Sequence, residues 1–239
     1  AIRIQNASDY GLTAGLHSLD PDEISQWLDE VEAGNLYVNR GITGAIVQRQ
    51  PFGGWKHSAV GPTAKAGGPN YVASLMRWSD TDDGELALVE QRFEHWMADV
   101  GRAEHDATGL RAEHNLFRYR PAGGIAVRFG PAATDRQRRL AEVAARAAGV
   151  RMVASEESDE DDSSFVARLA ERTVERVRLV GLGTAGDEIR RACHALFVSV
   201  DDAPPVSAAE IELPRWLREQ AVSLTAHRHG RVGTECSDG

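Results

Sequence analysis

Hydrophobic residues follow a helical spacing in the segment after His17. They recur at positions i, i+3, i+4 and i+7, on one face of a helix; they are Ile24, Trp27, Leu28 and Val31. Asp20 can cap the start of this helix, Pro21 suits its first position, and Glu23 stands where a capping-box acid belongs. Gly34 predicts its end, and the alternating residues NLYVN predict a short strand directly after it.

Beyond residue 77 the pattern alternates between helical and strand-like segments. The polar stretch SDTDDGE precedes an amphipathic helix from Leu86 to Val100. The segments that follow are two strand-like pieces in NLFRYRPAGGIAVRFG, a helix through Leu140 and Ala147, strand VRMVAS, the acidic run EESDEDD, a helix over 165–174, strand VRLV, a helix over 187–194, strand LFVSV, a helix over 214–219 and strand AVSLTAHR. This alternation predicts an α/β fold with a parallel, doubly wound sheet. The acidic run is expected to be a solvated loop, because like charges repel one another.

Composition narrows the classes of function. The chain has 239 residues, a net charge of −9, 42% hydrophobic and 26% charged residues, which is typical of a globular protein. The acidic balance argues against nucleic acid as a partner, since phosphate binding requires clustered Lys and Arg. No apolar run reaches the roughly 20 residues of a membrane-spanning helix. No signal peptide is visible, and two cysteines without disulfide or metal spacing favour a reducing cytoplasm.

The first residues also carry information. AIRIQNASDYGLTAG predicts the tail of a helix, a turn and a strand, with no earlier element to pack against and no starting Met. We therefore expect a truncated chain or a piece of a longer one.

The segment GAIVQRQPFGGWKHSAVGPTAKAGGPNYV, residues 44–72, is a glycine-rich loop. It contains a buried-looking aromatic, Phe52, and two lysines. It can be a structural crossover between domains, or a ligand-facing loop whose free N–H groups hold an anion. Composition alone leaves these two interpretations equally open.

The motifs in and around this loop resemble a known family. YGLTAGLHS, followed by AGNLYVNRGITGAIVQRQPFGGWKHSAVGPTAKAGGPNYV, is similar to the C-terminal part of the aldehyde dehydrogenase catalytic domain. PFGG-x-K-x-S after G-N-x-Y-V-N is general to aldehyde dehydrogenases. TGAIV-x-R-Q and GP-x-AKAGGPNY are typical of the L-glutamate γ-semialdehyde (1-pyrroline-5-carboxylate) dehydrogenase branch, which includes bifunctional proline-utilisation flavoenzymes with a proline dehydrogenase domain.

The resemblance implies roles for three residues. Backbone amides of a Gly-Ala pair anchor the α-carboxylate of L-glutamate γ-semialdehyde in this branch, which corresponds to Gly44 and Ala45. The aromatic residue of PFGG packs on the aliphatic part of the substrate, which corresponds to Phe52. Gln48 departs from the glycine common at its position, so the flexibility of the loop is expected to differ.

The resemblance also implies that parts of the enzyme lie elsewhere. The nucleophilic cysteine, the catalytic glutamate and the residues that bind NAD precede the matched segment in this family. The chain alone is therefore expected not to oxidise aldehydes, although the family is NAD-dependent. FAD is implied only if a proline dehydrogenase domain precedes the chain, and the complete enzyme is expected to form a homo-oligomer.

The second half has a resemblance of its own. AEHNLFRYRPAGGIAVRF, VSVDDAPP and LPRWLREQAVSLTAHRHGR are similar to the C-terminal region of long bifunctional proline-utilisation enzymes, a noncatalytic Rossmann-like domain. We expect a catalytic-domain piece over residues 1–78, a helical linker over 79–115, and a noncatalytic Rossmann-like domain over 116–239. The implied role of the last part is to pack on the catalytic domain, help cover its active site and assist association.

Two alternatives remain open. The chain can be a noncatalytic partner or structural subunit of an aldehyde dehydrogenase. It can also bind a dinucleotide independently, because Gly181, Gly183 and Gly186 spell G-x-G-x-x-G between a strand and a helix. Asp201 and Asp202 follow at about the distance of a ribose-binding acid, although short glycine patterns often arise by chance.

Cysteine and histidine residues point to no further chemistry. Cys193 lies on an apolar helix face and Cys236 in a polar tail, so neither matches a catalytic motif. His194, His227 and His229 could be read as metal ligands, but no acidic or thiol ligand is suitably spaced, and no metal site is expected.

Overall fold

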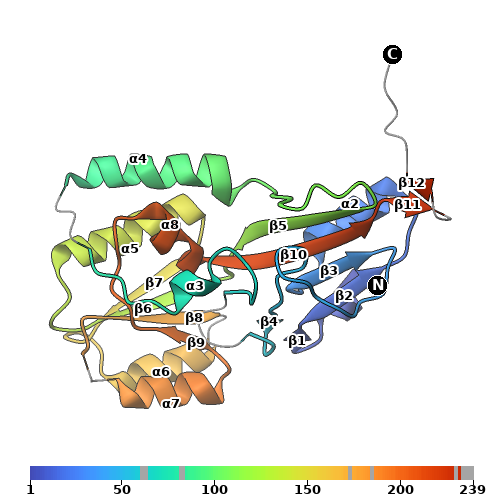
Figure 1. Cartoon of the computed structure of the whole chain (residues 1–239). Helices are drawn as coiled ribbons and strands as arrows, with labels where there is room; N and C mark the ends of the chain where they lie inside the picture. Colours follow the sequence, from blue (N-terminus) through green and yellow to red (C-terminus); the bar gives the residue numbers. More distant parts are fainter. Residues whose placement is uncertain (60–63, 81–83, 172–173, 184–185, 229–230, 233–239) are drawn as a thin grey trace.

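The structure is a computed structural model that describes residues 1–59, 64–80, 84–171, 174–183, 186–228 and 231–232. Two four-stranded sheets organise it, one on the right and one on the left of Figure 1. The short elements outside them are α1 (Ile2–Asn6), β1 (Tyr10–Gly11), which pairs with β4 (Trp55–Lys56), α3 (Tyr71–Ser74), and β11 (His227–Arg228), which pairs with β12 (Arg231–Val232).

The first sheet is mixed, with strand order β2-β3-β10-β5. Its strands are β2 (Thr13–Leu16), β3 (Asn35–Val38), β10 (Leu217–Thr225) and β5 (Glu113–Pro121). β2 and β10 run parallel to β3, whereas β5 runs antiparallel to β10. A hydrophobic cluster joins this sheet to α2 (Pro21–Glu30), mainly through Trp27.

The start of α2 was predicted correctly and its end was not. The Asp20 carboxylate accepts hydrogen bonds from the N–H groups of Asp22 and Glu23, so it is the N-cap. Glu23 does not complete a capping box: its carboxylate accepts a hydrogen bond from the Ser18 hydroxyl instead. The helix stops at Glu30, before Gly34, because the intervening residues already extend toward β3.

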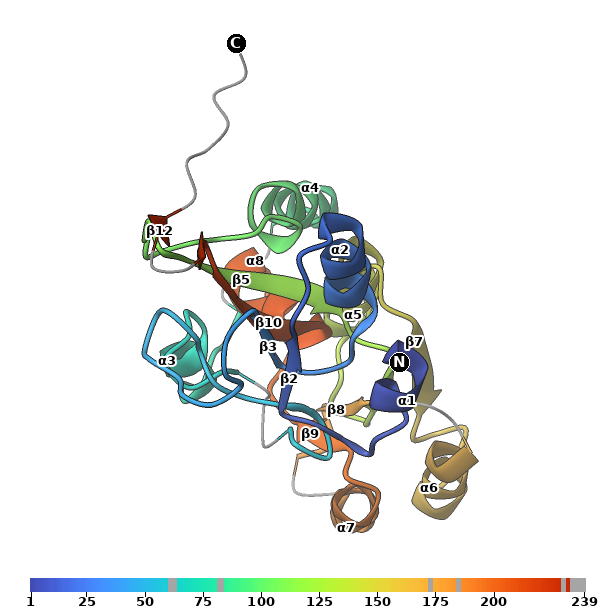
Figure 2. The ribbon, with the colours of Figure 1, turned by 90° about the vertical axis from the view of Figure 1, so that its right-hand side faces the viewer.

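The second sheet is parallel and doubly wound, as the sequence predicts. Its strand order is β7-β6-β8-β9. The strands are β6 (Ile125–Phe129), β7 (Met152–Glu156), β8 (Arg176–Val180) and β9 (Ser199–Asp201), with crossover helices α5 (Asp135–Ala148), α6 (Asp162–Glu171) and α7 (Asp187–Ala195). α4 (Leu86–Trp96) and α5 lie on one side of this sheet, and α6 and α7 lie on the other (Figure 1, Figure 2). The α/β fold class is thereby confirmed.

Two local expectations need correction. The helix expected over 214–219 is α8 (Ala209–Glu212) followed by a 3-10 turn (Leu213–Trp216), and residues 217–219 already belong to β10. The acidic run is not simply solvated. Glu160 O and Asp162 Oδ1 accept hydrogen bonds at 2.6 and 2.8 Å from Arg128, whose side chain is fully buried. A buried guanidinium needs such partners.

β10 connects the two ends of the sequence. It lies between β3 and β5, pairing Ala221 with Asn35 on one side and with Phe117 on the other. The division at residues 78 and 115 stays a prediction. The pairing of β10 with β3 is the contact that would join its first and third parts.

Candidate functional site

The loop after β3 presents two exposed amides that bond to no described residue. Gly44 and Ala45 are exposed, and within the described ranges neither backbone N–H donates a hydrogen bond. Gly44 has a φ of +90°, which side-chain-bearing residues rarely adopt, and a Cβ placed on it would meet nothing within 4 Å. The loop therefore combines free donors with open space, as an anion-binding backbone turn requires.

Two side chains hold the ends of this turn. The Tyr37 hydroxyl donates to the Gly44 carbonyl at 2.9 Å. Burial raises the pKa of Tyr37, which keeps this donor protonated at neutral pH. Gln50, 2% exposed, accepts from the Ile46 N–H at 3.1 Å and donates to Asn115 Oδ1 on β5 at 2.8 Å. The conformation of the turn is thus tied to the mixed sheet.

Phe52 is more exposed to solvent than the sequence suggested. Its side chain is 37% exposed, while its backbone pairs with Ala66 through two hydrogen bonds of 2.9 and 3.0 Å. The strand-like pairing fixes the backbone and leaves the ring partly open to an aliphatic ligand.

Gln48 adopts the left-handed conformation with a φ of +66°. This backbone geometry favours glycine, so the glutamine side chain makes it a strained position. The Gln48 N–H donates to Gly67 O at 3.2 Å, so the strained residue is held by a neighbouring segment.

Charged side chains next to the loop already have partners. Arg40 lies 2.9 Å and Arg49 3.9 Å from carboxylate oxygens of Glu113. The charge of these two arginines is therefore directed at Glu113, and the exposed backbone amides of Gly44 and Ala45 are donors left in the turn.

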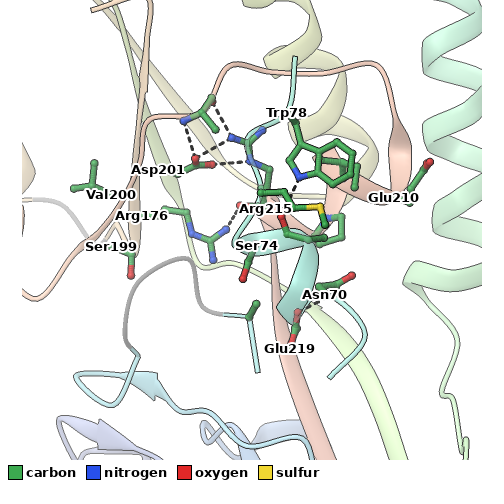
Figure 3. A pocket seen from close by; sticks show the side chains of 16 residues that line it. Asn70, Ser74, Trp78, Arg176, Ser199, Val200, Asp201, Glu210, Arg215 and Glu219 are labelled. Atoms are coloured by element: carbon green, nitrogen blue, oxygen red, sulfur yellow. Dashed lines mark hydrogen bonds and ion pairs between the residues drawn. The ribbon is translucent and has the colours of Figure 1, made fainter. Parts of the chain in front are cut away.

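A cavity of about 100 Å³ lies between the two sheets (Figure 3). Asn70 donates to Glu219 Oε1 at 2.9 Å on one wall. On the opposite wall, Asp201 accepts hydrogen bonds of 2.9 and 2.8 Å from Arg215. Arg178 and Arg215 hold the pKa of Asp201 at about 2 despite its burial. Asp201 is therefore committed to an internal ion pair, and the interpretation of it as a ribose acid fails; Asp202 pairs with Arg190 at 3.1 Å.

The glycine pattern after β8 has the predicted strand–loop–helix context, but its first glycine is covered by backbone. Gly181 has a φ of +71°, and a Cβ on it would lie 2.1 Å from the Ala133 nitrogen. The Ala132 N–H donates to Gly181 O at 3.1 Å, and the Gly130 N–H to Val180 O at 2.8 Å. In this strand order the loops after β6 and β8 form the switch point where ligands usually bind. Because the two loops bond to each other there, the residues do not fit a dinucleotide at Gly181.

The remaining candidates show no reactive arrangement. Burial raises the pKa of Cys193, whose side chain is 0% exposed, to about 11, so it is not a thiolate nucleophile at neutral pH. His194 and His227 are exposed, and Cys236 and His229 lie outside the described residues. Across the described ranges, no three His, Cys, Asp or Glu side chains gather as a metal site.

The helices of the described part are too short or too polar to cross a membrane.

Comparisons with known proteins agree with the motifs. Residues 1–80 match the model of the aldehyde dehydrogenase family. The 1-pyrroline-5-carboxylate dehydrogenases of Bacillus thuringiensis (strain Al Hakam) and Bacillus mycoides (strain KBAB4) are each 46% identical over 83 residues, which is 35% of this chain and 16% of theirs. Proline Utilization A from Corynebacterium freiburgense matches 95% of this chain at 37% identity and a TM-score of 0.77.

The matched segments are small parts of these proteins. The chain spans 16% of the length of the curated relatives and 24% of the structural neighbour. The resemblance expected from the sequence is nevertheless confirmed: residues 1–80 match the aldehyde dehydrogenase family model, and the chain is similar there to 1-pyrroline-5-carboxylate dehydrogenases.

Proposed function

We propose that this chain supplies the substrate-carboxylate anchor of an NAD-dependent L-glutamate γ-semialdehyde dehydrogenase that acts in proline catabolism. The observation that carries this proposal is the pair of exposed amides at Gly44 and Ala45, which bond to no described residue, within a segment similar to 1-pyrroline-5-carboxylate dehydrogenases. Two N–H groups directed at one point bind a carboxylate without a side-chain charge.

The chain's own residues bind and orient the substrate in this proposal. The amides of Gly44 and Ala45 hold the α-carboxylate, and the exposed ring of Phe52 contacts the methylene chain, which fixes the distance to the aldehyde carbon. The nucleophilic cysteine, the catalytic glutamate and the NAD site are supplied by residues outside this sequence. NAD, when bound there, accepts a hydride.

The second half of the chain has a structural role in this proposal. Its strand β10 completes the sheet that supports the Gly44 loop, and the first glycine of its own glycine pattern, Gly181, is covered by the backbone at Ala133. The same proposal includes three further properties of the complete enzyme: FAD in a neighbouring proline dehydrogenase domain, homo-oligomer formation and a cytoplasmic location.

An NMR titration of the 15N-labelled chain tests the anchor. L-Glutamate carries the same α-amino acid group as the semialdehyde, so it should shift the amide signals of Gly44 and Ala45 saturably. 4-Aminobutanamide, which keeps the amine and the methylene chain but has no carboxylate, is the control and should leave them nearly unchanged. Equal responses to both compounds, or none to L-glutamate, would refute the anchor.

An activity assay tests the division of labour. The chain alone should form no NADH from NAD and L-glutamate γ-semialdehyde, because Cys193 is buried and protonated. Turnover above the buffer rate would show that the nucleophile lies in this sequence after all.

A further inference from the structure

Lys65 is buried beside residues 44–52, which are called the carboxylate-binding loop because they hold Gly44, Ala45 and Phe52. Its side chain is 1% exposed, and its Nζ donates to Asn35 Oδ1 at 2.9 Å and to the Gly53 carbonyl. Its backbone N–H donates to Glu219 Oε2 at 2.7 Å. One residue thus connects β3, the PFGG turn and β10.

The backbone that follows Lys65 contacts the loop at two places. Ala66 pairs with Phe52 through two hydrogen bonds, and Gly67 accepts the N–H of Gln48 at 3.2 Å. Any displacement of Lys65 would therefore reach both the aromatic residue and the end of the Gly44 turn.

The space around the Lys65 ammonium suits a small head group. A Cβ added to Gly34 would lie 2.0 Å from Gly53 O and 2.9 Å from Lys65 Nζ, so the backbones approach each other as closely as glycine permits. The sequence has 27 Lys and Arg residues, yet only Lys56 and Lys65 are lysines. A compact ammonium fits where a planar guanidinium would need more room.

Burial and one acid determine the electrostatics of this contact. Burial lowers the pKa of Lys65 to about 7, and the Glu219 carboxylate on β10 opposes this shift. Asn35 on β3 and Gly53 in the turn face the ammonium with neutral oxygens. Either protonation state of the amine retains N–H donors for both oxygens.

We propose that Lys65 is a positioning residue, which holds the carboxylate-binding loop in its binding conformation through Gly53, Asn35 and the Ala66–Phe52 pairing. The ligand part of this inference rests on the proposed function. The ordering of the loop by Lys65 does not.

Substitution of the two lysines tests the proposal in the full chain. Lys65→Met keeps the aliphatic stem and removes the donors, so amide hydrogen exchange at Phe52 and Ala66 should become at least tenfold faster. The dissociation constant for L-glutamate should rise at least fivefold. Lys56→Met is the matched control, since the Lys56 ammonium donates to Asn6 O and Ser8 O and pairs with Glu32 at 2.8 Å, rather than with residues 44–53. In Lys56→Met, amide hydrogen exchange at Phe52 and Ala66 and the dissociation constant for L-glutamate should change less than twofold. Equal behaviour of the two variants would overturn the proposal.

A measurement on the unchanged protein covers the case in which Lys65→Met does not fold. Below pH 6 the Lys65 ammonium should give a slowly exchanging 15Nζ signal with a scalar coupling across the hydrogen bond to the Gly53 carbonyl carbon. Rapid exchange without coupling would overturn the proposal. If L-glutamate leaves the wild-type amides of Gly44 and Ala45 unchanged, the anchor function fails, while exchange and coupling still decide the role of Lys65.

Discussion

Two glycine loops in this chain follow buried parallel strands and have opposite surroundings. The loop after β3 is open, because a Cβ on Gly44 would meet nothing and the neighbouring amides have no partner among the described residues. The loop after β8 is closed at its first glycine, because the backbone at Ala133 occupies the space that Gly181 leaves. A glycine therefore indicates close approach, but only the structure shows whether a ligand or the chain itself approaches.

Gly181→Ala should have the largest effect on stability. It tests the loop after β8, where backbone covers the glycine. The added Cβ would overlap the Ala133 nitrogen, and φ +71° adds backbone strain, so unfolding free energy should fall by about 3 kcal/mol. Chemical denaturation measures this loss. The control is Gly183→Ala, where φ is +61° but the space is open, with an expected cost of about 1 kcal/mol. Equal costs would mean that Gly181 is not packed as described.

Asp201→Asn tests whether the Asp201 carboxylate, at the end of β9, stabilises the folded protein. The native pKa of about 2 lies below the unfolded value, so Asp201 stabilises the protein above about pH 4. That contribution is lost as pH falls toward 2. The loss amounts to about 2 kcal/mol at 1.36 kcal/mol per pKa unit. Acid denaturation of the variant should lack this component and should start from lower stability at neutral pH. An unchanged pH profile would contradict the ion pair with Arg215.

Gly44→Ala tests the open side. The side chain fits the space but not φ +90°, so the turn should relax and weaken L-glutamate binding about tenfold, or about 1.4 kcal/mol. Titration by NMR measures the affinity. Gly41→Ala, in the same exposed loop and also free of close neighbours, should bind like wild type. A loss of affinity in both variants would point to general loop disturbance instead.

Gln48→Gly should have the smallest effect, with a favourable sign. Glycine relieves the strain of φ +66° but makes the unfolded chain more flexible, so the net gain in unfolding free energy should be about 0.5 kcal/mol. Thermal or chemical denaturation resolves the sign against Thr43→Gly, an exposed position without positive φ, which should lose stability. Destabilisation in both variants would show that Gln48 is not strained.

Local structure was largely readable from the sequence. Asp20 caps α2 as predicted, and the alternation of helical and strand-like segments correctly predicted the parallel sheet. Both signals are local, because caps and hydrophobic periodicity act over a few residues. The motif letters also located the loop at Gly44.

Long-range contacts were not readable. Nothing near Lys65 in the sequence indicates that its N–H meets Glu219, or that Gln50 meets Asn115 on β5. The G-x-G-x-x-G pattern likewise could not reveal that Ala133 covers Gly181. These partners are chosen by tertiary packing, which a spacing rule does not contain.

The position of β10 has a consequence for how the protein is made. β10, one of the two inner strands of the mixed sheet, is synthesised long after β3, and Gln220 on it donates to Ala33 O, 187 residues earlier. Contacts of such sequence separation form slowly, and a growing chain cannot make them until β10 has been synthesised. The parallel sheet can assemble while the edge of β3 that later pairs with β10 is still unpaired. The carboxylate-binding loop would then reach its native order late, after translation has passed residue 225.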